Sequence, residues 1–102
     1  MPAYFVAFGT VKNAEQLARY VAESSPIVES FGGRFMGASD QTRVLLGEHP
    51  HKRIAIFEFP DLAACEAWYS SDAYRALWPV RQQAADFVFL AFEPGRAPTP
   101  VP

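Results

Sequence analysis

The sequence predicts a single α+β domain whose strands and helices follow the order β-α-β-β-α-β. Alternation of side chains with a period of two is typical of strands, and runs of this kind fall at 3–11, 34–38, 53–59 and 86–93. Segments with the three-to-four-residue spacing of helices lie after the first strand and after the third. This order is the ferredoxin-like arrangement, in which two helical regions cover one face of a four-stranded antiparallel sheet.

Length and composition limit the class of protein. The 102 residues have room for one domain, placed at 1–93, and half of them are hydrophobic, which excludes an intrinsically disordered chain. The net charge is −2 without a basic cluster, so nucleic-acid binding is not expected. No apolar run approaches the roughly 20 residues of a membrane span. With no signal-peptide pattern and a single cysteine, Cys65, a cytoplasmic protein is expected.

The first strand and helix follow one another directly. Both faces of strand 3–11 are apolar, which indicates that both faces of the sheet are covered. Asn13 is a favourable N-cap for the helix. Tyr20 lies off the apolar stripe of this helix and is expected at the surface or at an interface. Pro26 is expected to interrupt the helix and to begin a second short segment at 26–31. The stripe consists of Ala14, Leu17, Ala18, Val21 and Ala22.

The middle of the chain is predicted to form two further strands. The second strand is expected to continue, after a turn at 39–41, through residues 42–46. A loop at 47–52 contains Pro50. Strand 53–59 alternates most clearly, with Glu58 on the same face as two isoleucines.

The second helical region is expected to break twice. Asp61 is a favourable N-cap, and serines at 70 and 71 with Asp72 break and recap the helix. Pro79 removes a helical hydrogen bond, which predicts a kink or a new start nearby. Residues 94–102 contain four of the nine prolines and are expected to form an extended tail. The inward-facing stripe of this region consists of Tyr74, Leu77, Trp78 and Arg81.

One face of the predicted sheet lacks a covering layer. The helices cover one face, while the other still carries phenylalanine, valine and isoleucine side chains. A second copy of the chain is the economical cover, so the sequence predicts a homodimer packed sheet to sheet.

Several motifs resemble those of a known family. They are GGRF at 32–35, LGE at 46–48, RIAIFEFP at 53–60 and AWYSS at 67–71, followed by Tyr74 and Arg81. Over about residues 3–93 the chain resembles domain of unknown function family 1330, within the dimeric α+β barrel superfamily. The resemblance implies a barrel formed between the sheets of two copies. Relatives in the superfamily include cofactor-free monooxygenases, isomerases, haem-binding enzymes and ligand-sensing domains.

Glu58 and Arg81 are the first candidates for catalysis. Glu58 lies on an apolar strand face, where poor solvation would suit it to proton transfer. The alternative is a structural carboxylate paired with Arg34, Arg53 or Arg81. Arg81 lies on an inward-facing stripe, where its guanidinium either holds an anionic substrate oxygen or pairs with Glu58 or Asp86.

Aromatic side chains and a second arginine complete the candidate site. Tyr74 is the third candidate for catalysis, as a phenol that orients a ligand oxygen. Trp68, Tyr69 and Arg34 are candidates for substrate binding, although aromatic residues at helical spacing also form cores.

The remaining reactive side chains indicate no metal or other cofactor. His49 and His51 are the only histidines, and metal sites usually need three or four converging ligands. Cys65 is expected to be a buried, inert thiol.

These residues predict a cofactor-independent enzyme of the isomerase, lyase or monooxygenase type. Its substrate would be a small hydrophobic or aromatic acid or carbonyl compound. The alternative is a non-catalytic dimer that binds a small ligand or serves another enzyme as an accessory subunit. The expected partners are a second copy and a small-molecule ligand.

Overall fold

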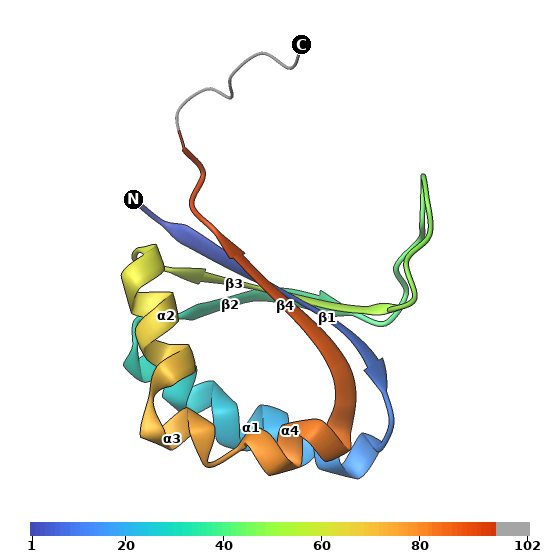
Figure 1. Cartoon of the computed structure of the whole chain (residues 1–102), viewed down its shortest axis with the longest axis horizontal. Helices are drawn as coiled ribbons and strands as arrows, with labels where there is room; N and C mark the ends of the chain where they lie inside the picture. Colours follow the sequence, from blue (N-terminus) through green and yellow to red (C-terminus); the bar gives the residue numbers. More distant parts are fainter. Residues whose placement is uncertain (96–102) are drawn as a thin grey trace.

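The computed structural model describes residues 1–95 of the chain. Four strands form one antiparallel sheet, and four helices lie along one of its faces (Figure 1). The strand order β2-β3-β1-β4 confirms the predicted α+β, ferredoxin-like arrangement. In chain order the elements are β1 (Ala3–Val11), α1 (Ala14–Ser30), β2 (Arg34–Ser39), β3 (Arg53–Phe59), α2 (Leu62–Ser70), α3 (Asp72–Arg75), α4 (Trp78–Ala84) and β4 (Ala85–Phe92).

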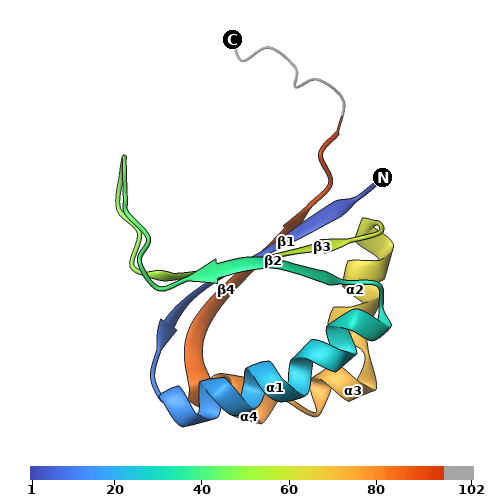
Figure 2. The ribbon, with the colours of Figure 1, turned by 180° about the vertical axis from the view of Figure 1, so that it is seen from behind.

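The strand register divides the sheet into two chemically different faces. Phe5 on β1 is buried beneath the helices, and its neighbours Tyr4 and Val6 point to the other side. We call the side away from the helices the open face, because no part of residues 1–95 covers it as a layer (Figure 2). Its residues are Tyr4, Val6, Phe8, Ile54, Ile56, Glu58, Val88, Leu90 and Phe92.

An aromatic core joins the covered face of the sheet to the helices. Phe59 and Tyr74 are completely buried, and Trp68 is 2% exposed. The ring of Phe5 lies 4.9 Å from the rings of both Trp68 and Phe89, between centroids. Aromatic rings bury large areas of apolar surface, so this cluster is a main source of the domain's stability.

Helix α1 continues through Pro26, and the predicted interruption is wrong. The helix runs unbroken over 17 residues with Pro26 on its exposed side. Ser24 and Val28, on either side of the proline, are both buried against the core. A proline removes only one helical hydrogen bond, and burial of this shared face keeps the two halves in one line.

The buried face of α1 also differs from the predicted stripe. Tyr20, Ser24 and Val28 are the buried residues of the helix, whereas Val21 is 43% exposed. Alanines made up most of the predicted stripe, and an alanine buries little area. The helix is instead turned so that the larger Tyr20 side chain is buried, which corrects the expectation that Tyr20 lies at the surface.

The second helical region breaks where the sequence predicts. The hydroxyl of Ser71 accepts a hydrogen bond from the backbone N–H of Tyr74 at 3.2 Å and caps α3. Helix α4 starts anew at Trp78, with Pro79 in its first turn. The first N–H groups of a helix have no intrahelical partner, so proline there costs no hydrogen bond.

Residues 40–52 form an arm that extends from the sheet instead of the predicted strand 42–46. No β-ladder includes these residues, and a strand without a paired neighbour is not stable. The hydroxyl of Thr42 donates to the carbonyl of Lys52 at 2.8 Å, which joins the two sides of the arm near its base.

Two further observations concern the chain as a whole. Among residues 1–95, no helix combines the length and apolar character needed to cross a membrane. From residue 96 onward the expected proline-rich tail lies outside the described residues.

Candidate functional site

Arg81 lies within a group of aromatic rings between α4 and β4. Its guanidinium carbon is 5.2 Å from the ring centroid of Trp78, 5.5 Å from Phe89, 5.7 Å from Tyr74 and 5.8 Å from Tyr69. A cation over an aromatic face is attracted to the ring electrons, more strongly where water is excluded. The rings therefore hold the guanidinium in place and shield part of it from solvent.

Backbone geometry brings this arginine to the rings. The break between α3 and α4 is closed by a hydrogen bond from the N–H of Leu77 to the carbonyl of Tyr74, at 2.9 Å. Arg81 follows one turn into α4, and its N–H donates to the carbonyl of Leu77 at 2.9 Å. The inward-facing stripe that the sequence predicts therefore survives the restart of the helix.

The charge of Arg81 has no carboxylate partner among residues 1–95. The four ion pairs in this part of the chain involve other cations. Nη1 of Arg81 donates one hydrogen bond to the hydroxyl of Tyr74, at 3.3 Å. Burial alone lowers the pKa of the guanidinium, but the hydrogen bond to Tyr74 and the nearby phenols raise it overall. Arg81 is thus a permanent cation with unused donors, suited to an anionic oxygen.

Two buried phenols continue the polar contact into the core. The hydroxyl oxygens of Tyr74 and Tyr20 are 2.5 Å apart. Burial is the main cause that raises the pKa of both phenols. Both remain neutral near pH 7, so Tyr74 is a hydrogen-bond donor and acceptor between Arg81 and Tyr20.

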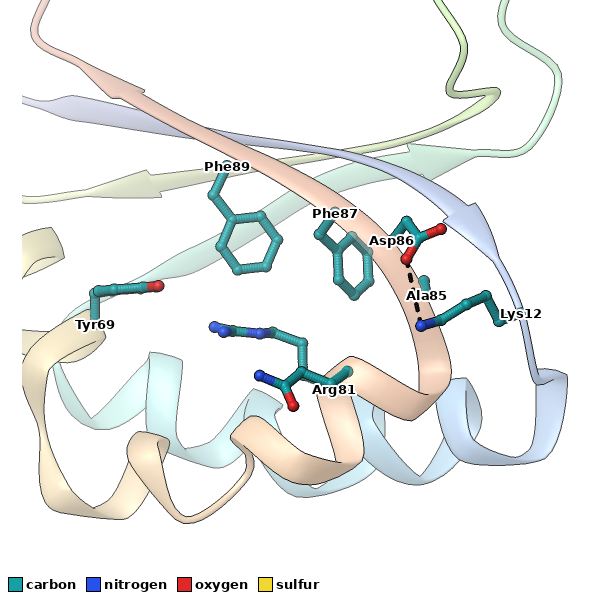
Figure 3. A pocket seen from close by; sticks show the side chains of 8 residues that line it. Lys12, Tyr69, Arg81, Ala85, Asp86, Phe87 and Phe89 are labelled. Carbon is teal, nitrogen blue, oxygen red and sulfur yellow. Dashed lines mark ion pairs between the residues drawn. The ribbon is translucent and has the colours of Figure 1, made fainter.

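A cavity of about 420 Å³ opens beside Arg81. Figure 3 shows the guanidinium and the Tyr69 phenol pointing toward one another across it, with Phe87 and Phe89 on the strand above. At the other end Asp86 forms an ion pair with Lys12 at 3.3 Å (Figure 3). The site therefore combines a cation, a carboxylate and aromatic walls.

Two less polar cavities share walls with the Arg81 cavity. One, of about 330 Å³, lies between α1 and the sheet and also touches Phe87 and Phe89. The other, of about 400 Å³, lies along α2 and is lined by Trp68, Tyr69 and Phe89. Trp68 is buried, and its indole N–H has no acceptor among residues 1–95. Apolar walls with a few unused donors are typical of small-ligand sites.

The structure brings four of the six candidate residues together. Arg81, Tyr74, Tyr69 and Trp68 lie on the covered side of the sheet, within one aromatic cluster. Tyr74 and Arg81 lie on one side of the helical region because the stripe continues across the break before Trp78.

Glu58 and Arg34 lie elsewhere, and the expected meeting of Glu58 with Arg81 does not occur. Glu58 is on the open face, opposite Tyr4 in the register of β1 and β3. Its carboxylate accepts a hydrogen bond from Arg34 Nη2 at 3.2 Å, with the Arg34 side chain 65% exposed. The structural alternative, a carboxylate paired with Arg34, is the arrangement found.

The two histidines lie close together at the base of the arm. The ring centroids of His49 and His51 are 5.6 Å apart, and His51 Nδ1 lies 2.8 Å from the hydroxyl of Thr10. Among residues 1–95 no three histidine, cysteine or carboxylate side chains converge. Cys65 is buried, and desolvation followed by the charge of Glu66 raises the pKa of its thiol to about 11, which makes it a poor nucleophile.

Several residues around the cavity were not among the sequence candidates, namely Lys12, Tyr20, Asp86, Phe87 and Phe89. Tyr20, Ser24 and Val28 recur every four residues, and this spacing was the available signal for the buried face of α1. Phe89 lies on the same strand face as Phe87, but nothing in the alternation of β4 indicates which face the helices cover.

Fold and site together define a small ferredoxin-like α+β protein with a cavity between sheet and helices. The chain belongs to the DUF1330 family, a domain of unknown function, whose profile matches residues 2–94. A comparison with curated proteins finds no match.

Solved structures with the same fold include proteins of known and unknown activity. RPA0582 of Rhodopseudomonas palustris, a protein of unknown function, has 23% identity and a TM-score of 0.75, over 94% of this chain and 84% of that one. SnoaB of Streptomyces nogalater, a cofactor-independent oxygenase, has 15% identity and a TM-score of 0.66, over 94% and 95%. A dimeric ferredoxin-like protein of Thermobifida fusca has 11% identity and a TM-score of 0.58, over 90% of each chain.

Proposed function

We propose that this protein binds a small aromatic or hydrophobic compound through an acidic oxygen beside Arg81, and acts on it without a cofactor. The observation that carries the proposal is the Arg81 guanidinium, which lines a cavity of about 420 Å³ and has no ion-pair partner among residues 1–95. A partly buried cation without a partner is costly, and an anionic ligand would supply the missing charge.

The chemistry that fits this site is stabilisation of negative charge on oxygen. For carbonyl substrates, reactions of isomerase, lyase and oxygenase types can share a first step, in which a proton leaves the carbon beside the carbonyl. The C–H electron pair then forms a C=C bond, and the carbonyl oxygen becomes an enolate oxygen. Arg81 and Tyr69, which both line the cavity, would donate hydrogen bonds to that oxygen, a form of stabilisation that is strong where water is excluded. The buried Tyr74 would act by holding the Arg81 guanidinium through its hydroxyl.

Asp86 takes the role of proton acceptor in this proposal. Glu58 lies across the sheet from Arg81, whereas Asp86, at the start of β4, borders the end of the same cavity where it pairs with Lys12. The Asp86 side chain is 67% exposed and paired with Lys12, so the carboxylate is open to solvent and able to pass a proton to it. One protein with the same fold is described as a cofactor-independent oxygenase, so the fold accommodates catalysis without a cofactor.

We further propose that the protein is a homodimer packed through the open face. Leu90 and Phe92 on this face are 54% and 50% exposed, in a row with Val88. One protein with the same fold is described as dimeric. Contiguous apolar surface of this kind is rare on monomers, and a second copy is a self-complementary cover.

Two measurements test the ligand proposal. The first compares binding of 2-naphthoate and neutral 2-naphthamide by tryptophan fluorescence, and the acid is expected to bind at least about tenfold more tightly. Equal affinity, or no binding of either compound, would contradict a role for Arg81 as an anion site.

The second measurement follows hydrogen–deuterium exchange beside the carbonyl of 2-tetralone in D₂O by NMR. The protein is expected to accelerate exchange, and Asp86→Asn and Arg81→Gln are each expected to slow it. Binding of 2-naphthoate without any acceleration would favour the alternative function, a non-catalytic dimer that binds a small ligand.

A further inference from the structure

The arm, residues 40–52, carries the most exposed large apolar side chains of residues 1–95. Leu45 is 95% exposed and Leu46 is 96% exposed, and Val44 beside them is 52% exposed. Single exposed apolar residues are common on protein surfaces, but adjacent leucines at the end of a projecting segment have no contact with their own domain. Exposure of this kind is typical of a surface that meets another molecule.

Specific contacts hold the base of the arm against the body of the domain. Nη1 of Arg53 lies 2.9 Å from Oδ1 of Asp40 at the start of the arm. At its other end the ring of His49 packs edge-on against Phe8, with 4.8 Å between centroids. These contacts fix the direction of the arm and keep its leucines away from their own core.

The arm projects past the sheet on the side of the open face. In Figures 1 and 2 the helices lie below the sheet and the arm rises above it, so the two are on opposite sides. A hollow of about 430 Å³ remains between the base of the arm and the open face. It is lined by Phe8, His49, Pro50, His51, Val88 and Leu90.

The exposed apolar area is large enough for a stable interface. The half-exposed residues of the open face and the leucines of the arm together expose on the order of 800 Å², which is what each partner gives to an interface of standard size. The open face alone falls short of that area, because its central residues on β1 and β3 are already partly buried. The arm supplies the difference.

We propose that the arm clasps a second copy of this chain, with Leu45 and Leu46 packed against the partner. This inference rests on the proposed dimer through the open face and adds a second contact region to it. In a two-fold symmetric dimer each copy gives one arm and receives one. Because the arm rises on the side of the open face, its leucines lie beside the molecule that covers this face. A second copy would offer them the apolar surface of its own open face.

Sedimentation equilibrium of one double variant and two single variants tests the role of the arm in the dimer. In Leu45→Ala/Leu46→Ala the dimer dissociation constant is expected to rise at least about tenfold, because two large apolar contacts are lost. Val21→Ala, which truncates an exposed apolar residue on α1 away from the arm, is the matched control and is expected to leave the constant unchanged. Ile56→Glu places a charge in the centre of the open face and is expected to give monomers.

The outcomes separate the arm from the dimer. A wild-type dimer whose dissociation constant is the same in the double leucine variant would overturn the role of the arm and leave the open-face dimer intact. A wild-type protein that is monomeric at every concentration would overturn both. Circular dichroism of each variant identifies any loss of folding, and none is expected for side chains as exposed as Leu45 and Leu46.

Discussion

The hydroxyl of Tyr20, on α1, lies 2.5 Å from the hydroxyl of Tyr74, on α3, although the two residues are 54 positions apart. This contact joins the first helix to the helical region that carries Arg81, whose guanidinium donates to the same Tyr74 oxygen. The position of the proposed anion site therefore depends on a buried hydrogen-bonded pair as well as on apolar packing.

Removal of either phenol is expected to destabilise the fold. Tyr74→Phe leaves the buried Tyr20 hydroxyl without a partner, which costs about 1–3 kcal/mol. After Tyr20→Phe the Tyr74 hydroxyl loses one contact but still accepts from Arg81, so the cost is smaller. Tyr74→Phe is expected to have the larger effect, because Arg81 also loses its acceptor. Urea unfolding measures both. The control is Tyr4→Phe on the open face, and a control as destabilising as the two buried variants would refute the argument.

The phenol pair also predicts a loss of stability at alkaline pH. Burial raises the pKa of Tyr20 and Tyr74 in the folded protein, whereas phenols in an unfolded chain titrate near pH 10. Above that pH the unfolded state releases protons that the folded state retains. The free energy of unfolding is therefore expected to fall as the pH rises above 10, by up to about 1.4 kcal/mol per pH unit for each of the two phenols.

Thermal unfolding between pH 8 and pH 11 measures this effect. The double variant Tyr20→Phe/Tyr74→Phe is expected to have a flatter stability profile than the wild type in this range. A wild-type profile as flat as that of the double variant would mean that the two phenols titrate normally in the folded protein.

Neutralising Arg81 and neutralising Glu58 are expected to have different consequences. Arg81→Gln removes the cation of the cavity and should weaken binding of 2-naphthoate at least about tenfold. Glu58→Gln removes one partner of an ion pair on the other face, whose Arg34 side chain is 65% exposed, and the affinity of this variant for 2-naphthoate should stay within about twofold of the wild type. Isothermal titration calorimetry measures both, and equal losses would place the ligand elsewhere.

Gly9 is expected to control the shape of the Arg81 cavity through Phe87. A Cβ atom at position 9 would lie 2.8 Å from the Phe87 ring, which also lines that cavity. Gly9→Ala therefore forces the ring to move, at a cost of about 1–3 kcal/mol, and should weaken 2-naphthoate binding. A variant with wild-type stability and affinity would show that the ring has room to adjust.

The strands and most of the candidate site were predictable from the sequence, because alternation fixes which side chains share a face. Glu58 was correctly grouped with Ile54 and Ile56. Both faces of the sheet are apolar, however, so the pattern did not indicate which of them the helices cover. The separation of Glu58 from Arg81 follows from that choice and required the structure.

Tertiary packing decided the outcome at Pro26 in α1 and at residues 42–46 in the arm. Pro26 has the local chemistry of a helix start, but burial of Ser24 and Val28 on one face keeps the helix continuous. Residues 42–46 were expected to continue the second strand but pair with no other strand. In each case local sequence described a preference, and contacts distant in the chain determined the outcome.

The Nε–H resonance of Arg81 in a ¹H–¹⁵N spectrum gives the most direct test of the proposed site. Arg81→Lys, which removes this resonance, provides the assignment. Titration with 2-naphthoate is expected to shift it with a saturable dependence on ligand concentration, while the resonance of Arg34 stays in place. Saturable binding that shifts the resonance of Arg34 and leaves that of Arg81 unchanged would contradict the site proposed between the sheet and the helices.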